Sequence, residues 1–278
     1  MKHNVLNSPR LQELKNKRRK SFQNKGIFAF FAVLVLFVGL GFLSRISKLN
    51  IQNIVMSGNI VVDSEDIEKV ARESMSGHYV WLFPKTNVFF YPKNKIAESI
   101  AQEFTRLKDI KLNITNIETL EISVAEREGV YIWCGVDLPE DASEEECLFL
   151  DKDGYLFDEA PYFSGEVYFK FYGEAFKEYD PIFKELVSFK ENIESIGLKP
   201  VALFMDIEGN ATLLLSSENT SGTNPQITFK ANDDLSKLAE NLQSALDTEP
   251  LKTDIKKKYS ALQYIDLRYG NKVYYKFR

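Results

Sequence analysis

The sequence is poor in the residues that most enzymes use for catalysis. It contains two histidines in 278 residues, His3 near its start and His78 beside Gly77. A zinc site of the H-E-x-x-H type is therefore excluded. The serine motifs G-x-S-x-G and S-x-x-K are absent, as are the P-loop and the fingerprint G-x-G-x-x-G. These absences remove the common signatures of metalloproteases, serine hydrolases, penicillin-binding proteins and nucleotide-binding enzymes.

Acidic pairs are the remaining candidates for catalytic groups. Asp151/Asp153 and Asp233/Asp234 contain the residue type that glycosidases use in pairs. Each pair lies at a predicted turn or helix start, where an acidic side chain has an ordinary structural role. We therefore expect no catalytic residues, cofactor or metal in this chain.

Cysteine is equally scarce. Cys134 and Cys147 flank an acidic segment, and each adjoins a short apolar run, "VYIWC" before it and "CLFLD" after it. Two such runs around a polar loop predict a hairpin, whose facing positions are close enough for a disulfide. Two free, buried thiols are the alternative. No histidine or third cysteine is near enough to suggest a metal site, and an oxidising compartment favours the disulfide.

One apolar run stands out from this background. Residues 26–43 contain no charge, and as a helix they would be about 27 Å long, enough to cross a bilayer core. A cleaved signal peptide has a shorter apolar region, about 7–15 residues, followed by a small-x-small site. The only such triplet, Gly39-Leu40-Gly41, lies inside the run. We therefore expect a retained transmembrane helix over residues 26–44.

The charge distribution predicts its orientation. Residues 1–25 carry eight lysines and arginines against one acid, Glu13, so this tail is +7. The whole chain carries −5, which leaves −12 for the remainder. Basic residues beside a span stay cytoplasmic, so we expect a single-pass protein of the cell membrane with residues 45–278 outside. A nucleic-acid-binding arm is the alternative for the tail, but the acidic exterior gives no support to nucleic-acid binding.

The external chain shows two successive patterns. Residues 49–126 read as β-α-α-β-β with antiparallel strands, a small α+β domain whose first helix is capped by Asp63 or Ser64. Residues 127–278 predict a mixed sheet with two helices on one face. The first helix begins near Pro181 and buries Ile182, Leu186, Phe189 and Ile193; the second buries Leu235, Leu238, Leu242 and Leu246.

The last segment, "YIDLRYGNKVYYKFR", predicts two short strands around Tyr269-Gly270-Asn271, or one bent edge strand. No later element follows to cover it, and an uncovered edge strand presents backbone groups to which a partner strand can bind. The alternative is that Tyr274 and Phe277 fill a core, while Lys272 and Lys276 protect the edge from aggregation.

In this order, the elements resemble the FtsQ/DivIB family of bacterial cell-division proteins. The resemblance covers nearly the whole chain, although Glu128-Gly129 stand where the family often has a proline. The residues that carry it are Gly58 and Asn59, Ser64 and Glu65, Glu126 and Arg127, the step from Asp151 to Gly154, and Ile265 to Tyr269.

The resemblance implies a fold and a function. It implies a POTRA domain at residues 49–126 and a C-terminal β domain at 127–278, in a non-enzymatic scaffold at the division septum. Its partners would be single-span coiled-coil proteins of the FtsB/DivIC and FtsL type, bound at the last strand. We expect Tyr269, Asn271, Val273 and Tyr275 to make the contacts. A membrane-anchored cell-wall hydrolase that uses paired carboxylates is the alternative function.

The first prediction concerns the apolar run. Because the run is long and lacks a usable cleavage site, the protein extracted from membranes should keep its original N-terminus. N-terminal sequencing checks this, and a mature chain that begins near Phe42 would contradict it.

Overall fold

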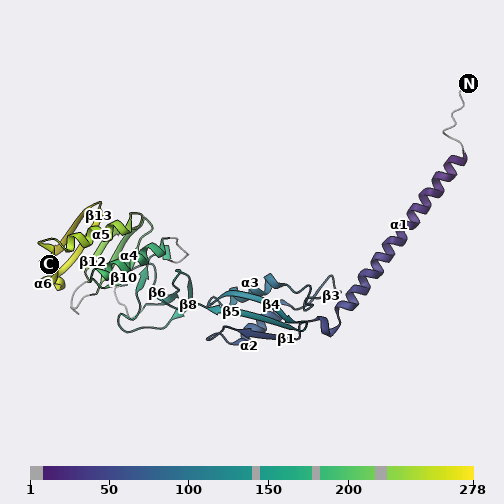
Figure 1. The fold of residues 1–278 in the computed structure, drawn as a ribbon, viewed down its shortest axis with the longest axis horizontal. Coiled ribbons are helices and arrows are strands. Elements are labelled where there is room, and N and C mark those ends of the chain that lie inside the picture. Colours follow the sequence, from purple (N-terminus) through teal and green to yellow (C-terminus); the bar gives the residue numbers. More distant parts are fainter. Residues whose placement is uncertain (1–8, 140–144, 177–181, 217–223) are drawn as a thin grey trace, which may run out of the picture. The chain divides into compact units, whose positions relative to one another are not determined.

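The computed structural model describes residues 9–139, 145–176, 182–216 and 224–278 (Figure 1). His3, Pro181 and part of the acidic loop between the cysteines lie outside these residues. The chain divides into two compact units, Met1–Glu126 and Arg127–Arg278, called here the N-terminal unit and the C-terminal unit. The described residues form a mixed α+β fold, as predicted.

The N-terminal unit begins with a long helix, α1 (Pro9–Ser44). From Ile27 onward most of its apolar side chains are exposed. Within the described part of the chain, α1 alone is long and apolar enough to cross a membrane, a property that a signal sequence shares. The predicted apolar helix is therefore present, and it extends back through the basic residues of the tail.

A three-stranded sheet follows, with the order β1-β5-β4. β4 and β5 pair in antiparallel fashion, whereas β1 and β5 are parallel. The prediction of antiparallel strands is therefore wrong for β1, because two helices and β4 lie between β1 and β5 and return the chain in the same direction. The bounds are β1 (Asn53–Ser57), α2 (Ser64–Ser74), β2 (His78–Tyr79), β3 (Phe83–Pro84), α3 (Lys93–Glu103), β4 (Leu107–Asn116) and β5 (Thr119–Glu126).

The core of this unit follows the periodicity of its elements. β5 buries every second residue, Leu120, Ile122 and Val124. Helices α2 and α3 pack against these strands through residues spaced three or four apart. The helix residues in this core are Ile67, Ala71, Ile96 and Ile100. Asp63 caps α2 by accepting from the Glu65 N–H at 3.0 Å.

Glu126, the last residue of β5, holds the loop between β1 and α2. Its Oε1 accepts from three consecutive backbone N–H groups, those of Ile60, Val61 and Val62, at 2.7, 2.9 and 3.0 Å. Gly58 starts this loop with φ +90°, and a Cβ there would lie 2.0 Å from the Val124 carbonyl oxygen. Only glycine fits at this position.

The C-terminal unit is built on a mixed sheet with the order β14-β13-β12-β11-β10-β9-β6-β7-β8. The pairs β6–β9, β9–β10 and β12–β13 are parallel, and the others are antiparallel. The bounds are β6 (Tyr131–Trp133), β7 (Cys147–Leu150), β8 (Leu156–Ala160), β9 (Lys170–Tyr172), β10 (Pro200–Met205), β11 (Asn210–Leu215), β12 (Gln226–Lys230), β13 (Leu262–Tyr269) and β14 (Lys272–Phe277). Short 3-10 turns span Ser47–Leu49 in the N-terminal unit, and Glu174–Phe176 and Tyr259–Ala261 in this one.

Three α-helices are described in this unit, one more than predicted: α4 (Phe183–Ser195), α5 (Leu235–Leu246) and α6 (Leu251–Lys258). Helices α4 and α5 bury apolar faces in the main core of the sheet. In α4, Phe183 is buried and Ile182 is half-buried, because the helix begins after Ile182. α6 was missed because it is short, rich in lysine and buries only Leu251, so it has no apolar stripe.

The second prediction tests the role of Glu126. A hydrogen bond to a charged group contributes about 1.5–3 kcal/mol, so Glu126→Ala should raise amide exchange at residues 60–62 about tenfold or more. Hydrogen exchange of the full chain in detergent measures this, with the exposed neighbour Glu128→Ala as the matched control. Unchanged exchange at residues 60–62 in the Glu126 variant would show that the carboxylate does not hold the loop.

Candidate protein-binding edge of the C-terminal sheet

Strand β14 forms one edge of the nine-stranded sheet. It pairs in antiparallel fashion with β13, and Tyr269 faces Lys272 across a two-residue turn. Gly270 occupies this turn with φ +68°, a conformation that suits glycine. Of the two arrangements that the sequence left open, the hairpin of two strands is therefore the one that forms.

The backbone of β14 presents alternate residues to its free side. The N–H of Arg278 donates to the Ala261 carbonyl at 2.7 Å, so the backbone of Arg278 faces β13. Because peptide groups alternate along a strand, those of Val273, Tyr275 and Phe277 point to the open edge. These N–H and C=O groups are the ones that an added strand would pair with.

The side chains of β14 divide between the two faces of the sheet. Tyr275 lies opposite Ile265, a fully buried core residue, and is itself half-buried with Val273 and Phe277 against the main core. Tyr274 lies opposite Asp266 on the other face and is 48% exposed. The interpretation that Tyr274 fills the core is therefore wrong, since the register of β14 turns it outward.

The predicted contact residues therefore differ in what they offer a partner. Tyr269 is 59% exposed and Asn271 lies exposed at the turn. Val273 and Tyr275 turn their side chains toward the core, which leaves their backbone groups for a partner. The structure adds Tyr274, whose ring packs edge-on against Tyr269 with 5.2 Å between centroids. The sequence alone does not distinguish Tyr274 from its neighbour Tyr275; the pairing of Tyr275 with the buried Ile265 shows that Tyr274 lies on the other face.

A charged pair stabilises the irregular stretch of β13 beside this tyrosine pair. The Arg268 guanidinium donates to both carboxylate oxygens of Asp266, from Nε at 2.9 Å and from Nη2 at 2.6 Å. These bonds, with smaller contributions from the Arg268 backbone and Thr228, hold the pKa of Asp266 below its usual value although burial alone would raise it. The pair lies where the register of β13 shifts between Asp266 and Tyr269.

The acidic pairs named as candidate carboxylates have structural contacts. Asp151 is buried, pairs with Arg127 at 2.6 Å, and accepts from the N–H groups of Asp153 and Tyr155 at 2.9 and 3.0 Å. Asp234 caps α5 by accepting from the Lys237 N–H at 3.1 Å. These contacts are the ordinary roles of acids at a turn and a helix start.

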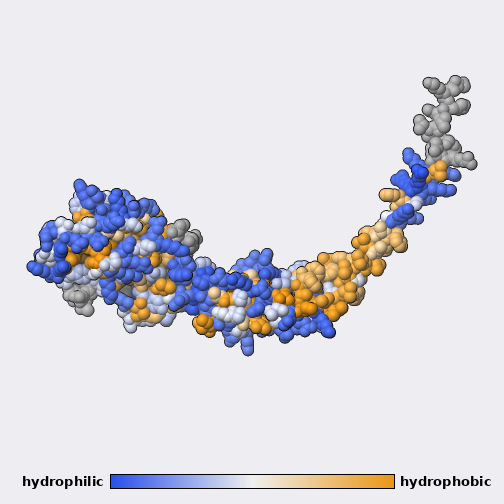
Figure 2. Space-filling model, in the orientation of Figure 1, coloured by the Kyte–Doolittle hydropathy of each residue, from blue (hydrophilic) through white to orange (hydrophobic). Residues whose placement is uncertain are grey.

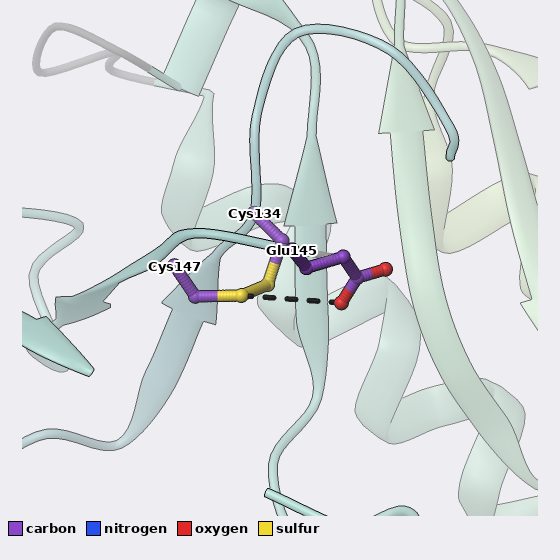
Figure 3. A group of neighbouring side chains, drawn as sticks. All are labelled: Cys134, Glu145 and Cys147. Carbon is purple, nitrogen blue, oxygen red and sulfur yellow. Dashed lines mark hydrogen bonds between the residues drawn. A yellow bond between two sulfur atoms is a disulfide. The ribbon is translucent and has the colours of Figure 1, made fainter. Parts of the chain in front are cut away.

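One group of side chains has the composition of a metal site. Cys134, Glu145 and Cys147 lie together (Figure 3). The two cysteines belong to a buried cluster other than the main core that contains the residues of α4 and α5. The two sulfurs form a disulfide, with S–S 2.05 Å, so neither is a thiolate that a metal requires. Glu145 pairs with Lys170 and accepts from the Tyr172 hydroxyl at 2.6 Å. Burial, together with this bond to Glu145, raises the pKa of Tyr172.

No protein-family model matches the chain. The curated proteins likewise give no match. The function of the chain is therefore inferred from its own sequence and structure.

The third prediction concerns the Asp266–Arg268 pair. Because the folded pKa of Asp266 is depressed below 3.8, its ionised form stabilises the fold above that pH, and the contribution is lost as pH falls through the folded pKa. Asp266→Asn should therefore lower the stability of the C-terminal unit by about 1–2 kcal/mol near neutral pH, and by less near pH 3.

Urea unfolding of the full chain in detergent measures this. On a Trp81→Phe background, the fluorescence of Trp133 reports on the C-terminal unit alone, because the chain has two tryptophans. Asp233→Asn, at an exposed position in the same unit, is the matched control. A deficit in the Asp266 variant that is equally large at both pH values would contradict the electrostatic explanation.

Proposed function

We propose that this protein is a membrane-anchored, non-enzymatic scaffold that binds another protein at the free edge of β14. The position of β14 at the edge of the sheet, where no described strand pairs with its other side, is the observation that carries the proposal. The resemblance to the FtsQ/DivIB family specifies the setting: the protein links early and late proteins of septum assembly at the bacterial division site.

The anchor in this proposal is α1, retained as a single span. Its exposed apolar side chains suit lipid as a surrounding. The basic residues that precede them favour a cytoplasmic N-terminus, and both folded regions are outside in this proposal. The tail thus serves topology, and nucleic acid is not a partner.

The external part of the N-terminal unit is a POTRA domain in this proposal. The order β-α-α-β-β and the core between two helices and one sheet face are in keeping with that assignment. The family-like residues also have local roles in the structure. Gly58 permits the turn, Asn59 donates to the Val62 carbonyl at 2.8 Å, and Glu126 binds the following N–H groups.

The partner binds by adding a strand to β14. Its backbone pairs with Val273 and Tyr275, and its side chains on the open face lie beside Tyr269 and Tyr274. Tyrosines of this kind are frequent energetic anchors of interfaces. The open face of β14 also carries Lys272 and Lys276, which favour an acidic strand. The resemblance implies that the partners are single-span coiled-coil proteins of the FtsB/DivIC and FtsL type.

A cell-wall hydrolase remains the alternative, and the contacts of the acids weigh against it. Asp151 is occupied by Arg127 and by two backbone N–H groups, and Asp234 by a helix start. A general acid or nucleophile needs a carboxylate that is free to meet substrate.

The fourth prediction separates backbone pairing from side-chain packing. Val273→Pro removes an N–H that points away from β13, so the β13–β14 ladder keeps its bonds while strand addition is blocked. Val273→Ala loses similar packing and keeps the N–H, which makes it the matched control. Co-purification of single-span partners from membranes should fall about tenfold or more for the proline variant, and much less for alanine.

The same variants test function in dividing cells. Septum formation should fail with Val273→Pro and continue with Val273→Ala. Asp153→Asn combined with Asp233→Asn should leave division intact, since both acids are outside the binding edge. If the proline variant divides normally while the acid variant changes wall chemistry, the hydrolase replaces the scaffold as the function.

A further inference from the structure

The N-terminal unit carries a large apolar surface beside the end of α1. Between Tyr79 and Phe90, large hydrophobic side chains are exposed, with Trp81 at 89% and Phe89 at 74%. Beside α1 lies a groove of about 770 Å³, lined in this segment by Tyr79, Val80, Phe83, Phe89 and Phe90; Ser44 and Asn87 are its polar lining residues. Figure 2 shows the hydrophobic surface of the helix continuing onto this part of the unit. Exposed apolar patches of this kind mark contact with a protein or a membrane.

Polar contacts fix this segment to the end of the helix. Arg45, the first charged residue after the apolar run, donates to the carbonyls of Trp81 at 3.1 Å and Leu82 at 3.2 Å. The buried Asn87 donates to the Ser44 carbonyl at 3.0 Å. Arg45 thus satisfies two backbone carbonyls of the segment, and the segment lies beside the C-terminal end of α1.

The aromatic rings reach further back along the helix. The ring of Phe37 packs against that of Phe83 with 5.2 Å between the ring centroids, and Phe83 packs against Phe90 with 5.9 Å between centroids. Phe37 precedes Arg45 by about 12 Å of helix. The apolar residues before Phe37 would cover only about 16 Å, too little for a hydrocarbon core of about 30 Å. A span built from α1 therefore needs Phe37 inside the bilayer, together with the rings that touch it.

We infer that residues 79–90 enter the extracytoplasmic leaflet beside α1 and that lipid acyl chains fill the groove. The inference rests on the proposed span. Lipid is the occupant because the groove is continuous with the side of α1 that a bilayer would surround. Tyr79 and Trp81 are the residue types that collect at membrane interfaces. Arg45 and Lys85, whose Nζ lies 5.7 Å from the centre of the Tyr79 ring, carry their charges to the headgroups.

The depth of entry has a physical limit. Irregular backbone is not stable in the hydrocarbon centre, where unpaired N–H and C=O groups find no partner. The segment therefore lies at the boundary of headgroups and acyl chains, where apolar faces are buried by about 5–10 Å. The segment then restrains the first folded domain against the membrane surface, in addition to the tether that α1 provides.

The two tryptophans of the chain allow a direct test with the full-length protein in phosphatidylcholine vesicles. Trp133→Phe leaves Trp81 as the only tryptophan of the chain. Trp81→Phe leaves Trp133, in the C-terminal unit, as the matched control. The vesicle lipids carry bromine near the headgroup end of the acyl chain or near its methyl end. We expect about a twofold loss of Trp81 emission with the shallow bromine, a smaller loss with the deep bromine, and weak quenching by aqueous acrylamide.

A third variant separates this inference from the proposed span. Leu34→Trp, with both native tryptophans replaced by phenylalanine, reports on the middle of α1, and deep bromine should quench its emission if α1 spans. Quenching of the Leu34→Trp variant without quenching of Trp81 would overturn the leaflet entry and keep the span. If bromine quenches neither emitter, both the leaflet entry and the span are overturned. A Trp81 that neither bromine nor acrylamide quenches is covered by protein, which also contradicts lipid as the occupant.

Discussion

Two adjacent side chains at the junction of the two units each bind back into their own unit. Glu126 accepts hydrogen bonds from three backbone N–H groups, those of residues 60–62, in the loop between β1 and α2. Arg127 pairs with the buried Asp151, and its guanidinium carbon lies 3.7 Å from the centre of the Tyr155 ring. The Glu-Arg pair that appeared in the sequence as a motif has a physical reason, because Glu126 holds the loop between β1 and α2 and Arg127 holds the turn between β7 and β8.

The side chains and the backbone of β14 likewise have different roles. β14 packs the side chains of Val273, Tyr275 and Phe277 against the core, and among the described strands only β13 pairs with it. Tyr269 and Tyr274 support each other on the open face, and the Asp266–Arg268 pair shapes the stretch of β13 that leads into the turn. A partner would therefore meet an edge that is already ordered. Binding of this kind loses less conformational entropy than one in which both strands must fold.

Most of the fold was predictable because local patterns and tertiary packing agree. The apolar run indicates a long helix, while the alternation in β5 and the stripes of α4 and α5 indicate which face of each element is buried. Prediction failed where the pattern was ambiguous or absent. Two adjacent tyrosines, Tyr274 and Tyr275, fit either parity, and only pairing with Ile265 decides between them. The parallel direction of β1 comes from its distant partner β5, and α6 buries too little to leave a stripe.

The parallel pairs of the C-terminal sheet also have a kinetic consequence. Ile132 pairs with Lys170 and Gln226 with Tyr264, so each pairing closes a loop of 38 residues. Such distant pairings form slowly, whereas the β13–β14 hairpin joins neighbouring residues. The hairpin contacts are therefore expected to form faster than these parallel pairings. At the β14 edge, Lys272 and Lys276 discourage pairing between chains, so the features that would suit the edge for a partner also oppose aggregation.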